Sequence, residues 1–196
     1  MRLNENTKIL GKKVILVPYE EKHVEKYHEW MKSPKLQELT ASEPLTLEEE
    51  YEMQRSWRND DDKCTFLILS KEVFEETGNE IESLIGDTNI FLSEDEELTG
   101  EAEIMIAEKG FQGKGLGWEA MVLMLKYGAE FLKIQKFCVK IGELNEKSLK
   151  MFSKLGFEET SRSTVFKEVT LDKSVDNSWI EFLDNNGGNW DVKSYR

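Results

Sequence analysis

The sequence predicts a single α/β domain with a mixed central sheet of about seven strands and helices on both of its faces. Short β-branched or alternating apolar runs take turns with segments whose apolar residues recur at helical spacing. The chain has 196 residues, which is enough for one hydrophobic core, and we find no internal repeat or linker. We place the domain at 1–175 and a partly flexible C-terminal extension at 176–196, where "LDNNGGNWDVKSYR" is rich in Asn and Gly.

The expected elements follow from apolar periodicity and from start and stop signals. Strands are expected at 13–17, 64–70, 84–92, 100–108, 136–141, 157–161 and 165–171, with turns at 76–83 and 95–98. Helices are expected at 20–32, 46–57, 115–132 and 145–156. Thr46 and Glu49 form a capping-box pattern, and Asn145 and Gly156 bound the last helix. Along the strand at 100–108, alternation separates Glu101 and Glu103 from Ala102 and its apolar neighbours.

Composition limits the classes of partner. The net charge of −13 argues against general binding to nucleic acids or membranes, both of which are polyanionic. Cys64 and Cys138 have no metal-ligand spacing and no disulfide pattern, which favours a reducing compartment and no metal cofactor. No segment has the length of a membrane span, and the N-terminus lacks an apolar signal core. We therefore expect a cytoplasmic protein, with a nuclear location also open.

The stretch "QGKGLG" at 112–117 has three glycines directly before the longest apolar helix. Glycines let a backbone approach a ligand closely, and the first N–H groups of a helix are free to bind an anion. A plain strand-to-helix turn is the alternative interpretation. A Walker loop is excluded because Leu116 and Gly117 stand where Lys and Ser or Thr are needed, and a Rossmann turn would follow the first strand rather than the fourth.

The motif Gln112-Gly113-Lys114-Gly115-Leu116-Gly117, placed after the fourth strand, resembles the acetyl-CoA signature of the GNAT acetyltransferases. A second stretch, from Asn145 through Ser148 and Met151 to Phe157, resembles a signature of that family's Rim-type branch, whose members acetylate protein N-termini. The resemblance covers about residues 10–172 and implies a sheet that splays between its fourth and fifth strands. "MRLNENTKILGKKVILVPY", "YHEWMKS" and "FKEVTL" further resemble a group within the family that acts on the N-termini of α- and β-tubulin.

The resemblance implies acetyl-CoA as co-substrate and assigns its binding residues. The implied pyrophosphate contacts are backbone amides of Gln112, Gly113, Lys114, Gly115, Leu116 and Gly117, with the Lys114 side chain near the phosphates. The implied pantetheine contacts are the backbone of Ile104, Met105 and Ile106, with Asn145 and Ser148 close to the reacting group. For each of these side chains a purely structural role, as a cap or a solvated residue, is the alternative.

The resemblance also indicates candidate catalytic residues. Glu103, or else Glu101, is the candidate acceptor of the amine proton, directly or through water. Many relatives carry a Tyr that protonates the leaving thiolate, and this chain has Phe152 in that place. The leaving thiolate is then protonated by Ser148 or by a water molecule, or it leaves without a general acid.

Three functions stay open at this point. The first is acetyl transfer to protein N-termini, with tubulin or microtubules as partners by resemblance. The second is acetylation of a small amine, and the third is acetyl-CoA binding or microtubule association with little catalysis. We expect the substrate side to be formed by the segment Ser33–Pro44 and the hairpin near Ser161–Val165.

Overall fold

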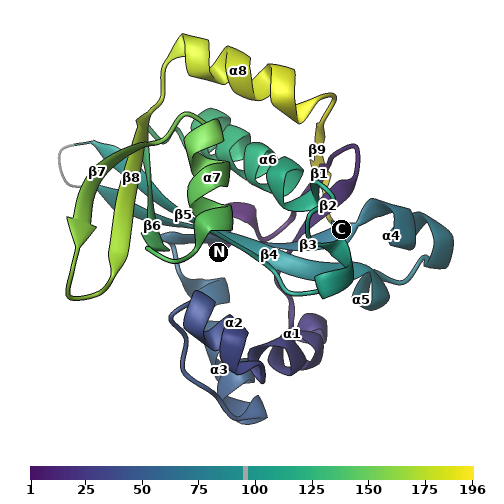
Figure 1. Ribbon diagram of the computed structural model, residues 1–196. Helices are drawn as coiled ribbons and strands as arrows, with labels where there is room; N and C mark the ends of the chain where they lie inside the picture. The colour runs from purple at the N-terminus through teal and green to yellow at the C-terminus, as the bar shows by residue number, and fades with distance from the viewer. Residues whose placement is uncertain (95–96) are drawn as a thin grey trace.

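The structure, a computed structural model, describes residues 1–94 and 97–196 and has helices on both faces of one sheet (Figure 1). In the described residues the sheet has nine strands in the order β7-β8-β6-β5-β4-β3-β2-β1-β9. The strands are β1 (Thr7–Leu10), β2 (Val14–Pro18), β3 (Lys63–Ser70), β4 (Leu84–Glu94), β5 (Leu98–Ile106), β6 (Lys136–Gly142), β7 (Glu158–Ser163), β8 (Glu168–Ser174) and β9 (Asp191–Ser194). The predicted fold class is confirmed, with two strands more than expected. The turn expected at 95–98 lies partly outside the described residues.

The helices form two layers around the sheet (Figure 1). They are α1 (Val24–Met31), α2 (Pro34–Leu39), α3 (Leu47–Asn59), α4 (Lys71–Thr77), α5 (Glu80–Ser83), α6 (Leu116–Glu130), α7 (Glu146–Lys154) and α8 (Asn177–Gly187). The central helix α6 packs with α7 and α8 on one face, where its side chains are buried almost all round. On the other face α1–α3 cover a second core that includes Tyr19, Tyr27 and Trp30.

The two extra strands are β1 and β9, at one edge of the sheet. β1 forms a tight antiparallel hairpin with β2, in which the Gly11 N–H donates to the Val14 carbonyl at 2.9 Å. β9 pairs with β1 from Thr7 opposite Ser194 to Leu10 opposite Asp191. Both strands have four residues, and β9 is polar, so neither has the apolar alternation that marks a strand in a sequence.

The prediction of a loose stretch at 183–196 is wrong, because the structure has the end of α8 and all of β9 there. Asp176 caps α8 by accepting a hydrogen bond from the Trp179 N–H at 2.8 Å. Trp179 and Leu183 are buried, and the Trp179 Nε1–H donates to the Leu155 carbonyl at 2.8 Å. The spacing of these two apolar residues was the available signal for a helix, and the Asn and Gly content obscured it.

Two further segments are more helical than expected. The turn at 76–83 is largely taken up by the end of α4 and by α5, and the segment Ser33–Pro44 contains α2, which begins at Pro34. A proline at the first position of a helix is favourable because its missing N–H would have no partner there. The capping box is confirmed: the Glu49 N–H donates to the Thr46 hydroxyl and the Glu49 carboxylate accepts from the Thr46 N–H.

Candidate active site

The centre of the site is an opening between two neighbouring strands. β5 and β6 run parallel and are paired only from Thr99 to Glu101, opposite Lys136 to Cys138. β5 then continues to Ile106 and β6 to Gly142 with no shared pair. The predicted splay is therefore confirmed. The facing edges of these continuations have backbone groups without a strand partner, so an extended ligand could pair with β5 at Ile104–Ile106.

The glycine turn leads from the end of β5 into α6. Gly113 and Gly115 have φ of 74° and 82°, in the left-handed region that favours glycine. A Cβ at Gly113 would meet no atom within 4 Å, so packing does not account for that glycine. Gly115 is the N-cap and has no side chain to cap α6, so the amides of its first turn stay available for an anion. For residues 113–117 this geometry fits the phosphate cradle, which was expected at 112–117.

Gln112 contributes differently from the expectation. Its N–H is already bonded to the Lys109 carbonyl at 3.3 Å, and its side-chain Nε2 donates to the Ile106 carbonyl at 2.8 Å. The residue thus holds the turn against the last residue of β5, and its amide is not free for a phosphate. The Lys114 ammonium lies 5.6 Å from the centre of the Phe111 ring. The backbone carbonyl of Lys114 accepts a hydrogen bond from Lys13.

Lys13 is a residue of this site that the sequence analysis missed. Its Nζ donates to the Lys114 carbonyl at 3.2 Å and lies 3.2 Å from where a Cβ of Gly115 would be. Its backbone N–H donates to Glu119 Oε1 of α6 at 2.8 Å, which fixes the start of β2 against the helix. An ammonium is therefore held beside the cradle by contacts between segments about 100 residues apart, for which a sequence carries no local signal.

On the other side of the opening, β6 leads into α7. Asn145 Oδ1 accepts a hydrogen bond from the Ser148 N–H at 3.2 Å, so the predicted cap is confirmed. The Phe152 ring is buried and packs edge-on against Phe157, with 5.2 Å between ring centres and 78° between planes. Phe152 is thus a core residue of α7 and supplies no proton donor.

The two candidate carboxylates lie on the face of the sheet covered by α1–α3. Glu101, in the last residue pair before the two strands separate, forms an ion pair with Lys140 of β6, with 2.6 Å between Oε2 and Nζ. Glu103 is open to solvent at its surface, yet protein groups surround it closely enough that desolvation raises the pKa of its carboxyl. Lys63 and Lys140 oppose this rise and the charge of Glu101 adds to it. A carboxyl that holds protons more tightly is a better base, which supports Glu103 in this role. Glu101 is engaged by Lys140 and is the weaker candidate for that reason.

Further charged residues near Glu103 were also missed. Lys63 is buried on β3 between two aromatic rings, with Nζ 3.4 Å from the centre of Trp57 and 3.8 Å from that of Phe91. Burial lowers the pKa of its ammonium to about 8, although the charges of Glu103 and Asp87 act in the opposite direction. Asp87 is buried on β4, next to β5.

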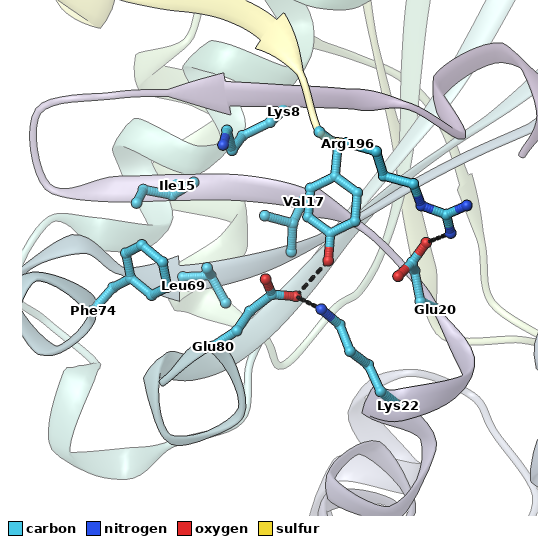
Figure 2. A pocket seen from close by; sticks show the side chains of 10 residues that line it. Lys8, Ile15, Val17, Glu20, Lys22, Leu69, Phe74, Glu80 and Arg196 are labelled. Carbon is cyan, nitrogen blue, oxygen red and sulfur yellow. Dashed lines mark hydrogen bonds and ion pairs between the residues drawn. The ribbon is translucent and has the colours of Figure 1, made fainter. Parts of the chain in front are cut away.

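A recess of about 370 Å³ lies elsewhere, over the ends of β1–β3 (Figure 2). Its charged side chains are largely paired with one another. Glu80 accepts hydrogen bonds from Tyr195 at 2.7 Å and Lys22 at 3.0 Å, and Arg196 pairs with Glu20 (Figure 2). The recess thus holds the C-terminal segment in place, and it contains none of the residues predicted for the site.

A splayed parallel strand pair with a glycine turn before its central helix defines an acetyltransferase of the GNAT type. The chain belongs to this family, since the model of the Acetyltransferase (GNAT) domain matches residues 13–158. It is 54% identical to human "Alpha/beta-tubulin-N-acetyltransferase 9", covering 100% of this chain and 97% of the relative. It is 56% identical to the Drosophila melanogaster protein of the same name, covering 94% of each. The predicted resemblance to the group of GNAT proteins named for tubulin N-acetylation is confirmed. The protein is an acetyltransferase.

Solved structures agree with the fold. Spermidine N-acetyltransferase from Vibrio cholerae, in complex with CoA and spermine, has a TM-score of 0.70 at 16% identity, covering 91% of this chain and 99% of that chain. RimL, a ribosomal L7/L12 alpha-N-protein acetyltransferase, has a TM-score of 0.71 at 15% identity, covering 86% and 95%. Within residues 1–94 and 97–196 no three metal-binding side chains cluster, and none of the helices described there could span a membrane.

Proposed function

We propose that the protein transfers the acetyl group of acetyl-CoA to the N-terminal α-amine of proteins, with tubulin as the expected substrate in the cytoplasm. The observation that carries this proposal is the opening between β5 and β6, which has a glycine turn and the uncapped start of α6 at one end and carboxylates on one face. The names of the relatives, which include tubulin N-acetyltransferases from human and Drosophila melanogaster, support the choice of substrate.

In this proposal the chain binds acetyl-CoA along the edge of β5. Amides of 113–117 and the Lys13 ammonium face the pyrophosphate, and the helix dipole of α6 adds partial positive charge. The free edge at Ile104–Ile106 pairs with the pantetheine amides, which places the thioester near the point of separation at Glu101. Asn145 and Ser148 then lie across the opening, beside the thioester.

The reaction requires a neutral amine. Its nitrogen attacks the thioester carbonyl carbon, the new C–N bond forms, the C–S bond breaks, and the sulfur leaves as a thiolate. Glu103 accepts the proton that the nitrogen loses, directly or through water. Because Phe152 is a core residue, the thiolate takes its proton from solvent or from the Ser148 hydroxyl. An N-terminal amine has a pKa of about 8, against about 10.4 for Lys, so far more of it is neutral at physiological pH.

The surface next to the opening favours a protein acceptor over a small amine. Leu144, Val165 and Phe166 are 88%, 83% and 76% exposed, the three most exposed large apolar side chains in the described residues. They lie on two adjacent turns, joined by a hydrogen bond from the Glu143 N–H to the Lys167 carbonyl at 2.8 Å. A small polyamine would not contact such a surface, whereas a folded protein presented beside the opening would cover it.

The proposal is tested by measuring kcat/KM with acetyl-CoA for three classes of acceptor. These are short peptides with a free α-amine and no Lys, the same peptides with a blocked α-amine and one Lys, and spermidine or spermine. We expect turnover confined to the free α-amine. Preferential turnover of polyamines would support the small-amine function instead, and acetyl-CoA binding without any turnover would support a binding role.

The variant Glu103→Gln tests the assigned base. It removes the proton acceptor and keeps the shape of the side chain, so we expect kcat to fall by about 10²-fold with little change in acetyl-CoA affinity. Glu101→Gln is the matched control on the same face of β5, and we expect a smaller effect because Glu101 is engaged by Lys140. Equal kcat for Glu103→Gln and wild type would remove Glu103 from the mechanism.

A further inference from the structure

A buried carboxyl group lies on β4, the strand next to β5, which carries the proposed base Glu103. Asp87 of β4 is 3% exposed. In the antiparallel pairing of β4 and β5, Asn89 lies opposite Glu103 and Asp87 lies opposite Met105. Since paired residues share a face of the sheet, Asp87 is the diagonal neighbour of Glu103. Diagonal neighbours on adjacent antiparallel strands lie roughly 7–8 Å apart. Both carboxyl groups thus belong to the face on which the acceptor amine approaches.

A chain of hydrogen bonds holds Asp87 in place. The Thr65 hydroxyl of β3 donates to Asn89 Oδ1 at 2.6 Å, and Asn89 Nδ2 donates to Asp87 Oδ2 at 2.8 Å. All three residues are buried. Because the Asn89 oxygen is occupied by Thr65, its amide must donate toward Asp87, so one carboxyl oxygen is kept as an acceptor and the group cannot rotate freely. A network of this kind fixes the position of the carboxyl relative to β5.

Four titratable groups interact with Asp87, and they come from different elements. They are Glu103 on β5, Lys63 on β3, Tyr19 after β2 and Tyr27 on α1. Burial raises the pKa of Asp87 to about 7; the Asn89 hydrogen bond and Lys63 oppose the rise, and the charge of Glu103 adds to it. Asp87 therefore changes its charge at physiological pH next to a second carboxyl whose pKa is also raised.

We propose that Asp87 and Glu103 work as a coupled pair, in which Glu103 faces the acceptor amine and buried Asp87 is the positioning residue that sets how readily Glu103 takes the proton. This rests on the proposed function, since it assigns a partner to the proposed base. While Asp87 is protonated, Glu103 can stay ionised and act as the base. When Asp87 ionises, its charge repels that of Glu103 and makes the protonated form of Glu103 more favourable, as in other close carboxyl pairs.

The pair makes a prediction about the pH dependence of the reaction. We expect kcat/KM for a free-α-amine peptide to change near pH 7 in the wild type, where Asp87 ionises beside Glu103, and we expect Asp87→Asn to lose that inflection because an amide cannot ionise. Asp172→Asn is the matched control, because Asp172 lies on the same face two strands away, on β8 opposite Cys138, and we expect it to keep the wild-type profile. Acetyl-CoA affinity, measured by calorimetry, should be the same in wild type and both variants.

A second measurement uses the wild-type protein alone and does not depend on enzymatic activity. The side-chain carboxyl ¹³C shifts of Asp87 and Glu103 are followed by NMR from pH 4 to pH 9 in the wild-type protein. We expect Asp87 to titrate near pH 7 and Glu103 to show a second inflection at the same pH. Independent titrations, or an inflection near pH 7 that persists in Asp87→Asn, would overturn the inference. A protein with coupled titrations that acetylates no amine would contradict the proposed function and leave the pair intact.

Discussion

At the scale of single residues, the proposed phosphate cradle requires glycine at the start of α6. Gly115 has φ of 82°, and a Cβ there would lie 3.2 Å from Lys13 Nζ. We predict that Gly115→Val lowers acetyl-CoA affinity at least tenfold, because a β-branched residue disfavours this conformation and displaces Lys13. Titration calorimetry measures the effect, and Gly110→Ala, which has open space and no positive φ, is the control. If Gly115→Val bound acetyl-CoA as tightly as wild type, the cradle would have been assigned to the wrong turn.

Some residues of the candidate site could be predicted from the sequence, and others could not. The glycine turn and the Asn145 cap are local patterns, and both lie where the sequence placed them. Alternation along one strand likewise put Glu101 and Glu103 on the same face. Lys13 and Asp87 enter the site through contacts with distant segments, and neither position has a local signal that separates it from an ordinary strand residue.

At the scale of elements, the hairpin of β7 and β8 is expected to recognise a protein acceptor. Val165 and Phe166 at its tip are exposed and contribute nothing to the core. We predict that the double variant Val165→Ser with Phe166→Ser lowers kcat/KM for a folded protein substrate about tenfold and leaves kcat/KM for a short N-terminal peptide unchanged. Leu47→Ser is the control, since Leu47 is an exposed apolar residue of α3. Equal losses for both substrates would indicate damage to the site rather than a docking surface.

The two strands that the sequence analysis missed have four residues each. β9 pairs with β1 across nearly the whole chain, from Thr7 to Ser194, and β1 forms a hairpin with β2. The pairing of β9 is non-local, and propensity over four residues is too weak to reveal either strand. The sequence of α8 contains a capping residue, Asp176, and apolar residues at helical spacing, Trp179 and Leu183. The helix was not predicted because the Asn and Gly residues that follow are typical of a loop.

At the scale of the whole molecule, Glu80 ties the C-terminal segment to the start of α1. Burial acts to raise the pKa of its carboxyl, but hydrogen bonds from His23, Tyr195 and Lys22 outweigh burial and lower it to about 2. The His23 Nδ1 accepts from the Glu20 N–H, so its Nε2–H donates to Glu80, at 2.5 Å. The carboxylate thus joins parts of the chain that are far apart in sequence (Figure 2).

The pKa shift of Glu80 gives a prediction for stability. Because its folded-state pKa is below the unfolded value of about 4.3, its stabilisation is complete above that pH and is lost as the pH falls toward 2. We predict that Glu80→Gln lowers the free energy of unfolding by about 2 kcal/mol at pH 7 and by clearly less at pH 3. Urea denaturation at both pH values measures this, with Glu76→Gln, an exposed residue of α4, as the control. A deficit that is equal at the two pH values would contradict the assigned ionic role.

In the proposed function, the opening between β5 and β6 delivers acetyl groups to the α-amine of a folded protein. The most direct test incubates tubulin that has a free N-terminus with the enzyme and deuterated acetyl-CoA, and locates the label by mass spectrometry of N-terminal and Lys-containing peptides. We predict deuterated acetyl on the α-amine, and its loss with Glu103→Gln. Label on Lys side chains alone would contradict the proposed function, and labelling that Glu103→Gln leaves unchanged would contradict the assigned base.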